Sequence, residues 1–307
     1  NCNLSDTVKI SSKAARIGGS RLGLSTNDEI TVENLLYGLM LKSGNDAAIA
    51  LSEHVGGSVE GFADKMNEKA RALNLSSTHF VSPHGLDDDN HYTCALDLAR
   101  LTDYALKNET FSKIVSTKIY TIILNGYPKT LSNTNELLGN LDGIYGVKTG
   151  FTNGANRCLV TACKRGDLDI ICVVLGCDTK KDRTIDSTQL IKYTFDNYSL
   201  VNIKDVIIND FENWSHSHKN SFTINKGVSQ GLELYLENSD FSFSHIAINN
   251  SDLEKIKTSV SFQSYFDAPL LNNSKIGEIV LEIDGTPYLS IRILNNNAKI
   301  GRASCRE

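Results

Sequence analysis

The feature that most constrains the fold is a change in hydrophobic pattern near residue 199. Between residues 32 and 106, three segments place apolar residues at helical spacing, which predicts amphipathic helices. Later in the chain, apolar and polar residues alternate over 232–237 and 277–283, which predicts half-buried strands. We therefore expect two domains: residues 1–199 with mixed helices and strands, and residues 200–298 with a small all-β fold.

Composition excludes several classes of protein. Hydrophobic residues make up 40% of the 307 residues, enough for a globular core, and the apolar runs are far shorter than a membrane span. The net charge is -5, shared as -2 over residues 1–198 and -3 over residues 199–307, so neither part is basic and no nucleic-acid partner is expected. Seven cysteines occur without a CxxC pair, and Cys158, Cys163 and Cys172 are expected to be small buried residues with free thiols.

No cofactor or metal is expected either. His216 and His218 offer two metal ligands one residue apart, but no acidic or cysteine partner lies near them in the sequence. We expect these histidines to lie in a solvated loop.

Ser43-Gly44-Asn45 forms a polar break between two apolar helices, over 32–41 and from about residue 46 to residue 54. Such a position is buried or lies at the floor of a cleft, where an unpaired hydroxyl or amide costs about 1–3 kcal/mol. One interpretation is that Ser43 or Asn45 caps the second helix. The other interpretation is that these polar side chains bind a ligand.

Lys148-Thr149-Gly150 ends a strand that contains several glycines. Gly150 would let a ligand backbone approach closely, and a lysine cation beside a threonine hydroxyl suits a carboxylate. The alternative is that Lys148 is an edge-strand lysine that discourages aggregation.

Penicillin-binding proteins and class A β-lactamases carry a Ser-x-x-Lys nucleophile, a Ser-x-Asn element and a Lys-Thr-Gly strand, in that order. The second and third elements occur here in the right order and on the expected structures. Further segments resemble the D-alanyl-D-alanine carboxypeptidases, which are low-molecular-mass penicillin-binding proteins. These segments are 19–24, 35–40, 43–48, 73–75, 78–80, 84–87, 143–152 and 173–176, together with Asn67. The resemblance covers nearly all of residues 5–198 and, more weakly, residues 200–296.

The resemblance implies an α+β fold: a β-lactamase/transpeptidase-like domain, with an antiparallel sheet flanked by helices, followed by a small all-β domain. It also implies a serine peptidase that removes the terminal D-Ala from peptidoglycan stem peptides through an acyl-enzyme, which β-lactams trap. The protein would then act outside the cytoplasm, either secreted or at the outer face of the bacterial membrane.

Roles for individual residues follow from the same resemblance. Ser43 matches the hydroxyl that relays a proton to the leaving amine, and Asn45 matches the amide that orients the substrate. Lys148 matches the cation of the site, while Thr149 and Arg183 match the residues that bind the terminal carboxylate. Gly150 and Phe151 complete the set of matching residues that bind the substrate. The backbone N–H of Phe151 would donate one hydrogen bond to the oxyanion.

One element of the pattern is absent: no serine in the chain is followed by a lysine three positions later. We expect the nucleophile, the base lysine and an export signal to lie upstream of Asn1, so that this chain is an inactive fragment. Residues 299–307, with Cys305, match nothing in the family, and we expect them to be a non-native tail. A C-terminal membrane anchor would lie beyond them.

Two other functions remain open from the sequence. One is a D-Ala-D-Ala endopeptidase of the same fold, whereas the appended β-rich domain argues against a β-lactamase. The other is a non-catalytic cell-wall-binding module that uses the remaining part of the cleft.

Overall fold

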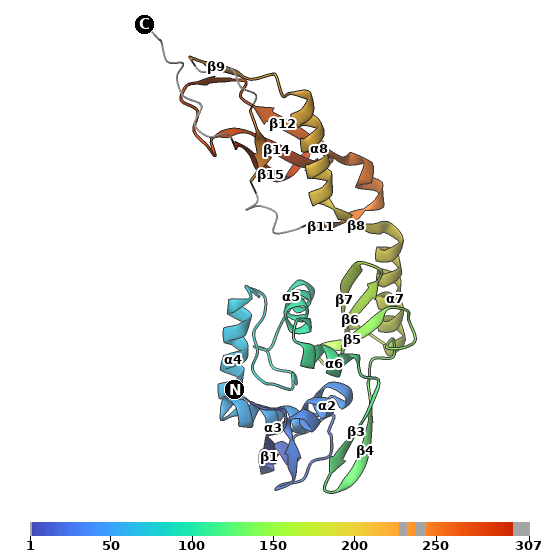
Figure 1. Ribbon diagram of the computed structural model, residues 1–307. Coiled ribbons are helices and arrows are strands. Elements are labelled where there is room, and N and C mark those ends of the chain that lie inside the picture. The colour runs from blue at the N-terminus through green and yellow to red at the C-terminus, as the bar shows by residue number, and fades with distance from the viewer. Residues whose placement is uncertain (1, 227–231, 238–243, 297–307) are drawn as a thin grey trace. The chain divides into compact units, whose positions relative to one another are not determined.

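The computed structural model describes residues 2–226, 232–237 and 244–296 (Figure 1). The tail expected at 299–307, with its Cys305, lies outside the described residues. The described ranges nevertheless include most of both predicted domains.

Two compact units make up the chain, Asn1–Thr194 and Phe195–Glu307. The division lies inside α7 (Lys180–Asn197), so this helix contributes residues to both units. The boundary expected from the sequence, after residue 199, falls shortly downstream, within β8 (Tyr198–Asn202).

Several helices of the first unit begin at polar capping residues. The side chains of Thr31, Ser58 and Asn108 each accept a hydrogen bond from the backbone N–H three residues later, which caps α2, α4 and α6. Gly57 ends α3 in the left-handed region, with φ of 76°. Besides α7, the helices are α1 (Ser12–Arg16), α2 (Val32–Lys42), α3 (Asn45–Gly56), α4 (Val59–Ala72), α5 (Ala95–Leu106) and α6 (Glu109–Ser116). The helices predicted between residues 32 and 106 are confirmed, whereas α1 and α6 were not predicted.

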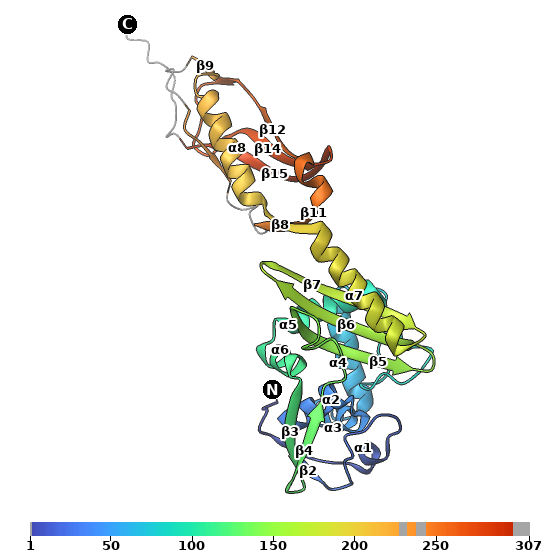
Figure 2. The same ribbon diagram turned by 90° about the vertical axis from the view of Figure 1, so that its right-hand side faces the viewer.

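The central sheet of this unit is antiparallel, in the order β5-β6-β7. Two further antiparallel pairs, β1 with β2 and β3 with β4, complete the unit. Their bounds are β1 (Thr7–Lys9), β2 (Glu29–Thr31), β3 (Ile119–Leu124), β4 (Tyr127–Ser132), β5 (Ile144–Thr152), β6 (Asn156–Arg165) and β7 (Leu168–Cys177). α7 covers one face of the central sheet and α5 and α6 cover the other (Figures 1 and 2). The predicted arrangement of an antiparallel sheet between helices is confirmed.

Packing fixes β5 against the helices around it. Val147 on β5 is buried with Val115 of α6 and Ala162 of β6. The next residue, Lys148, lies directly opposite Val160 of β6, which packs against the same cluster. β5 is also an edge strand, since only β6 pairs with it in the central sheet.

The second unit contains a four-stranded antiparallel sheet in the order β10-β15-β14-β12. Asp284 and Gly285 both have positive φ and form the tight turn between β14 and β15. The strands after β8 are β9 (Thr223–Asn225), β10 (Leu234–Leu236), β11 (His245–Asn249), β12 (Ile256–Phe262), β13 (Tyr265–Asp267), β14 (Lys275–Ile283) and β15 (Thr286–Asn295), with a 3₁₀ helix η2 (Asn250–Lys255).

The β-rich character of this unit is confirmed, but the expectation that it is all-β is wrong in one element. Residues 203–217 form helix α8 (Ile203–Ser217), which buries Ile203, Ile207 and Phe211 in the core of the unit. These three residues are four positions apart, so they occupy one face of the helix. The helix was not predicted because the alternating patterns over 232–237 and 277–283 indicated strands for this part of the chain.

α8 also corrects the placement of the two histidines. His216 lies in the last turn of α8, and His218 caps its end, stacked on Trp214 with ring centroids 5.1 Å apart. Neither residue is therefore in the loop that the sequence suggested.

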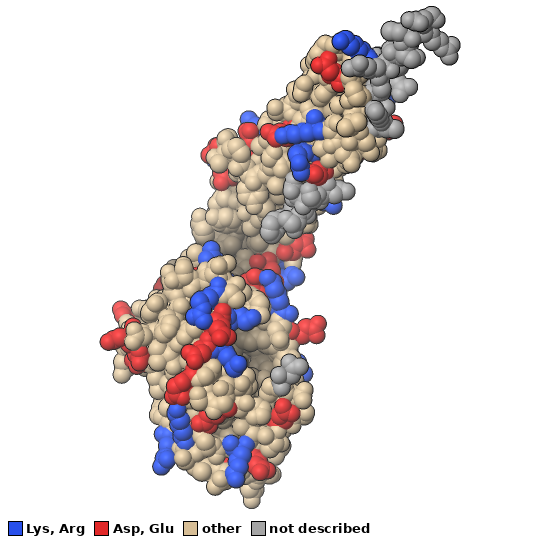
Figure 3. Space-filling model, turned by 90° about the vertical axis from the view of Figure 1, so that its left-hand side faces the viewer, with Lys and Arg blue, Asp and Glu red and all other residues tan. Residues whose placement is uncertain are grey.

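Surface charge is mixed. On the face shown in Figure 3, Lys and Arg side chains lie among Asp and Glu side chains over the first unit. Within the described residues, no helix combines the length and the hydrophobicity needed to cross a membrane.

Candidate active site

Ser43 lies at the junction between α2 and α3 in the left-handed conformation, with φ of 56° and ψ of 42°. Its hydroxyl accepts a hydrogen bond from Nζ of Lys148, a residue 105 positions later in the chain. The capping interpretation does not hold, because Gly44 is the N-cap of α3 and makes no side-chain capping bond. The structure thus brings the two sequence motifs into direct contact.

Lys148 extends from β5 into this contact and is partly buried. Its Nζ also donates to the carbonyl oxygen of Thr149 at 2.8 Å. Burial, followed by the positive charge of Arg183, lowers the pKa of Lys148 from its ordinary value to about 8. The edge-strand interpretation is therefore insufficient, because this ammonium group is turned to an internal hydroxyl.

Thr149 and Gly150 continue the exposed edge of β5. The Thr149 hydroxyl lies 2.7 Å from the hydroxyl of Thr134. A Cβ placed on the exposed Gly150 would meet only the Cβ of Cys158, at an ordinary contact distance of 3.6 Å. Packing within the protein therefore does not require a glycine at this position.

Arg183 lies on α7 and is only 3% exposed. Its Nη2 donates to Oε1 of Glu136 at 2.5 Å, and Nη1 lies 3.5 Å from the carbonyl oxygen of Cys158. The hydroxyl of Thr184 donates to the same Glu136 oxygen at 2.7 Å. Burial alone would raise the pKa of Glu136, but these hydrogen bonds and the Arg183 charge hold it below the usual value. The guanidinium expected to bind a substrate carboxylate is therefore already paired with a carboxylate of the protein.

Asn45 is 8% exposed and is fixed by the loop before α2. Its Nδ2 donates to the carbonyl oxygen of Gly18 at 2.8 Å, and its backbone N–H donates to that of Ser20 at 2.8 Å. A Cβ on Gly19 would lie 2.6 Å from the same Nδ2. Asn45 therefore lies two residues from Ser43 in a rigid setting, and no bond to Lys148 is found within the described structure.

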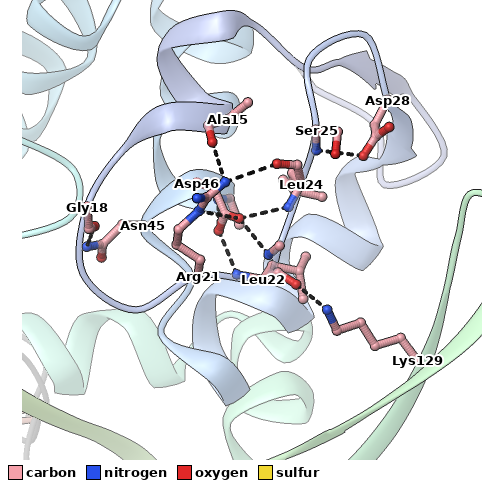
Figure 4. A network of polar contacts seen from close by, with 12 residues as sticks. Ala15, Gly18, Arg21, Leu22, Leu24, Ser25, Asp28, Asn45, Asp46 and Lys129 are labelled. Atoms are coloured by element: carbon pink, nitrogen blue, oxygen red, sulfur yellow. Dashed lines mark hydrogen bonds and ion pairs between the residues drawn. The ribbon is translucent and has the colours of Figure 1, made fainter.

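Asp46 explains the rigidity of this setting (Figure 4). It is fully buried and accepts hydrogen bonds at 2.7–3.0 Å from four backbone N–H groups, those of Leu22, Gly23, Leu24 and Ala47. One carboxylate thus joins the start of α3 to the loop that also holds Asn45.

Phe151 follows Gly150 on β5 and is 52% exposed. The guanidinium of Arg157, its cross-strand neighbour on β6, lies 3.6 Å from the ring centroid. The turn between these strands is held by Asp87, whose carboxylate accepts the backbone N–H of Gly154 at 3.1 Å. The hydroxyl of Thr152 and that N–H lower the pKa of Asp87.

Sequence reasoning missed the segment 133–136, which contributes Thr134 and Glu136 to the site. Asn133 and Asn135 shape it, because Asn133 Oδ1 accepts the N–H of Asn135, whose own Nδ2 donates to the carbonyl of Gly146 on β5. The available signal was a run of four polar residues, Asn-Thr-Asn-Glu, directly before two leucines.

Two other features lie apart from the predicted residues. A cavity of about 460 Å³ is lined by residues of α5, α6 and the central sheet, among them Asp103, Tyr145 and Asp169. Ligand atoms of Cys2, Asp6 and His54 lie within 4.8 Å of one another. None of the predicted site residues takes part in either group.

Comparison with known proteins identifies the family. The sequence model of the D-alanyl-D-alanine carboxypeptidase family matches residues 1–179. The D-alanyl-D-alanine carboxypeptidase DacF of Bacillus subtilis is 33% identical over 285 residues, which cover 92% of this chain and 70% of that protein.

Solved structures agree with the fold. Penicillin binding protein 5 of Haemophilus influenzae superposes with a TM-score of 0.72 at 27% identity, covering 98% of this chain and 84% of that one. The carboxypeptidase DacD of Francisella tularensis gives a TM-score of 0.74 at 22% identity, covering 98% and 83%. These similarities confirm the transpeptidase-like fold, and the chain belongs to the D-alanyl-D-alanine carboxypeptidase family of enzymes.

Proposed function

We propose that this chain forms the substrate-binding part of a serine-type carboxypeptidase that removes the terminal D-Ala from peptidoglycan stem peptides. The observation that carries the proposal is the hydrogen bond from Lys148 to Ser43. It links a hydroxyl at a helix junction, which can pass on a proton, to a cation on an exposed strand edge, which suits the terminal carboxylate of a peptide.

In this proposal the ligand lies along the free edge of β5. The Lys148 ammonium and the Thr149 hydroxyl bind the terminal carboxylate of the peptide. The backbone N–H of Phe151 donates to the carbonyl oxygen that becomes negatively charged during the reaction. Gly150 leaves room for the ligand backbone between these two contacts.

Ser43 moves a proton. Because its hydroxyl accepts from Lys148, its own proton is free to be donated to the amine of the departing D-Ala, and Lys148 then resupplies it. The lowered pKa of Lys148, about 8, suits this exchange near neutral pH. Asn45 orients the backbone of the ligand from the neighbouring position.

Arg183 has a different role in this proposal from the one the resemblance suggested. Since it is buried and paired with Glu136, we assign it an electrostatic effect on Lys148 and on the bound carboxylate rather than a direct contact. A direct contact would require the ligand carboxylate to displace Glu136.

The roles of nucleophile and base remain unassigned, because the 307 residues contain no Ser-x-x-Lys sequence. We therefore propose that this chain alone binds the peptide without releasing D-Ala, and that β-lactams acylate only a protein that also carries that motif. Peptidoglycan lies outside the cytoplasmic membrane, so the proposed site of action is extracytoplasmic.

The test is a binding titration of N-acetyl-L-Gln-D-Ala-D-Ala by calorimetry. Lys148→Ala and Thr149→Val should each weaken binding at least tenfold, because each removes a direct contact to the carboxylate. Lys164→Ala, which removes an exposed lysine from the neighbouring strand, is the matched control and should bind as the wild type does. Equal affinity in all four proteins, or equal binding of the all-L peptide, would refute the proposal.

A further inference from the structure

We infer that Cys2, Asp6 and His54 form a binding site for Zn²⁺ on the surface of the first unit. The ligand atoms of the three side chains, a thiol sulfur, a carboxylate oxygen and an imidazole nitrogen, lie within 4.8 Å of one another. None of the three belongs to the site around Ser43 and Lys148, so the inference does not depend on the proposed function. No sequence motif pointed to them, because His54 is distant in the chain from the other two residues.

The separations of the ligand atoms are close to those around a coordinated zinc ion. Tetrahedral zinc lies about 2.0–2.3 Å from its nitrogen, oxygen and sulfur ligands, which places these atoms roughly 3.3–3.6 Å from one another. Nε2 of His54 lies 3.9 Å from Oδ2 of Asp6, so this pair needs to close by only about half an ångström. Cys2 and His54 are exposed, and rotation of their side chains is sufficient for such a shift.

The three groups are available as ligands. At 3.9 Å the contact between Asp6 and His54 is too long for a hydrogen bond, and none joins any two of the three side chains in the described part of the chain. The thiol of Cys2 makes only a long contact, of 3.9 Å, with the carbonyl oxygen of Asn3. Zinc would therefore displace few existing bonds. The sulfur binds the ion as a thiolate, and its proton passes to water.

The backbone holds the Asp6 carboxylate in place. The carbonyl oxygens of Asp6 and Leu4 accept hydrogen bonds from the N–H groups of Val32 and Glu33, at 2.9 and 3.0 Å, which fix this segment to the start of α2. The N–H of Asn3 also donates to Oδ2 of Asp6 at 2.9 Å. Hydrogen bonds of this kind orient the carboxylates that bind metal ions.

His54 reaches the same place from a different element. It lies in the last turn of α3, and Leu51 of α3 belongs to the same buried cluster as Val8 of β1. The core therefore fixes the end of α3 near β1, which begins directly after Asp6. A zinc ion bound to Asp6 and His54 would add a direct bond between these two parts of the unit.

The ligand set selects zinc among the common divalent ions. Thiolate and imidazole are ligands that zinc prefers, whereas calcium and magnesium take oxygen ligands in larger number. Three protein ligands leave the fourth tetrahedral position to water. Cys177 offers a contrast, because its thiol donates to Asp186 at 3.6 Å but this pair belongs to no three-ligand group among the described residues.

The experiment titrates zinc sulfate calorimetrically into the untagged chain, kept reduced by a phosphine. We expect a single tightly bound zinc ion per wild-type chain. Cys2→Ala, Asp6→Asn and His54→Gln should each weaken binding at least tenfold, because losing a residue that only supports a ligand already costs about 10–100-fold. Cys177→Ala and His216→Gln, which remove another thiol and another exposed imidazole, are the matched controls and should bind as the wild type does.

Cobalt supplies a spectroscopic readout of the ligands. Co²⁺ added to the wild type should give a thiolate-to-cobalt charge-transfer band and the strong visible bands of tetrahedral coordination. The charge-transfer band should be absent from Cys2→Ala and unchanged in Cys177→Ala. The far-UV circular dichroism spectrum of each variant establishes that it is folded.

Three results would overturn the inference: no zinc binding by the wild type, wild-type affinity in the three ligand variants, or a charge-transfer band that persists in Cys2→Ala. An equal loss of affinity in Cys177→Ala or His216→Gln would overturn it too, because the ion would then lie elsewhere. Each of these results would leave the proposed function intact, since the peptide titration does not involve these residues.

Discussion

Lys148 offers the most discriminating test of the site, because the protein lowers its pKa from 10.5 to about 8. If the protonated amine binds the terminal carboxylate, the affinity for a D-Ala-D-Ala peptide must fall as the pH rises above about 8. With this pKa, the protonated fraction is about nine-tenths at pH 7 and about one-tenth at pH 9. Affinity should therefore fall about tenfold between these two pH values.

Stability should move in the opposite direction. The unfolded chain keeps the lysine proton up to its ordinary pKa near 10.5, whereas the folded chain loses it near 8. Between these values the unfolded state binds more protons, so the contribution of Lys148 to the free energy of unfolding rises with pH. Below pH 8 both states are protonated, and this contribution is constant and unfavourable.

The assay is calorimetric titration of N-acetyl-D-Ala-D-Ala from pH 6.5 to pH 10, with the peptide amide as the uncharged control. Lys148→Arg should bind the carboxylate with no change between pH 7 and 9, because a guanidinium stays protonated throughout. An affinity for the wild type that stays constant to pH 9 would refute the reasoning, since it would mean that Lys148 titrates near 10.5.

Three further outcomes are expected. Asp46→Asn should lower the free energy of unfolding by about 2–6 kcal/mol in urea, because the N–H groups of Gly23 and Leu24, in a partly buried and a buried bond, lose their acceptor; Asp28→Asn, whose one bond to Ser25 is exposed to solvent, should change it by about 0.5 kcal/mol at most. Glu136→Gln should move the pH midpoint of peptide binding below that of the wild type, because the Arg183 charge near Lys148 is no longer neutralised. An unchanged midpoint would show that the Arg183–Glu136 pair has no effect on the pKa of Lys148. Leu281→Ala, at a fully buried position, should destabilise the second unit by about 2–5 kcal/mol, read from the fluorescence of the single tryptophan, and a loss under 1 kcal/mol would show that the core refills the space.

Features that depend on neighbours in the sequence could be predicted. Helical periodicity identified α2, and the alternation of apolar and polar residues over 277–283 identified β14. The pairing of Ser43 with Lys148 also followed, although 105 residues separate them, because the order of the motifs pointed to a known arrangement. In each case the sequence carries a distinctive residue type at a defined spacing.

Other parts of the site depend on contacts that leave no such pattern. Glu136 follows two asparagines and a threonine and resembles any polar turn, yet it neutralises a guanidinium 47 positions later. Arg157 resembles an ordinary strand residue until the register places it opposite Phe151. A pairing across strands is set by the hairpin turn and its irregularities, which a single residue type does not encode.

The arrangement of charges explains why a glutamate is needed at all. Arg183 and Lys148 are two cations close enough for one to lower the pKa of the other, and Arg183 is 3% exposed. A buried guanidinium without a partner would cost several kcal/mol, which is more than one hydrogen bond to a carbonyl oxygen offsets. Glu136 therefore stabilises Arg183 in the free protein, and in the proposed function this leaves Lys148 as the cation for the ligand carboxylate. In the proposed function the ligand carboxylate contacts Lys148, whose pKa is lowered to about 8. The affinity should therefore change with pH near 8 and not near 10.5.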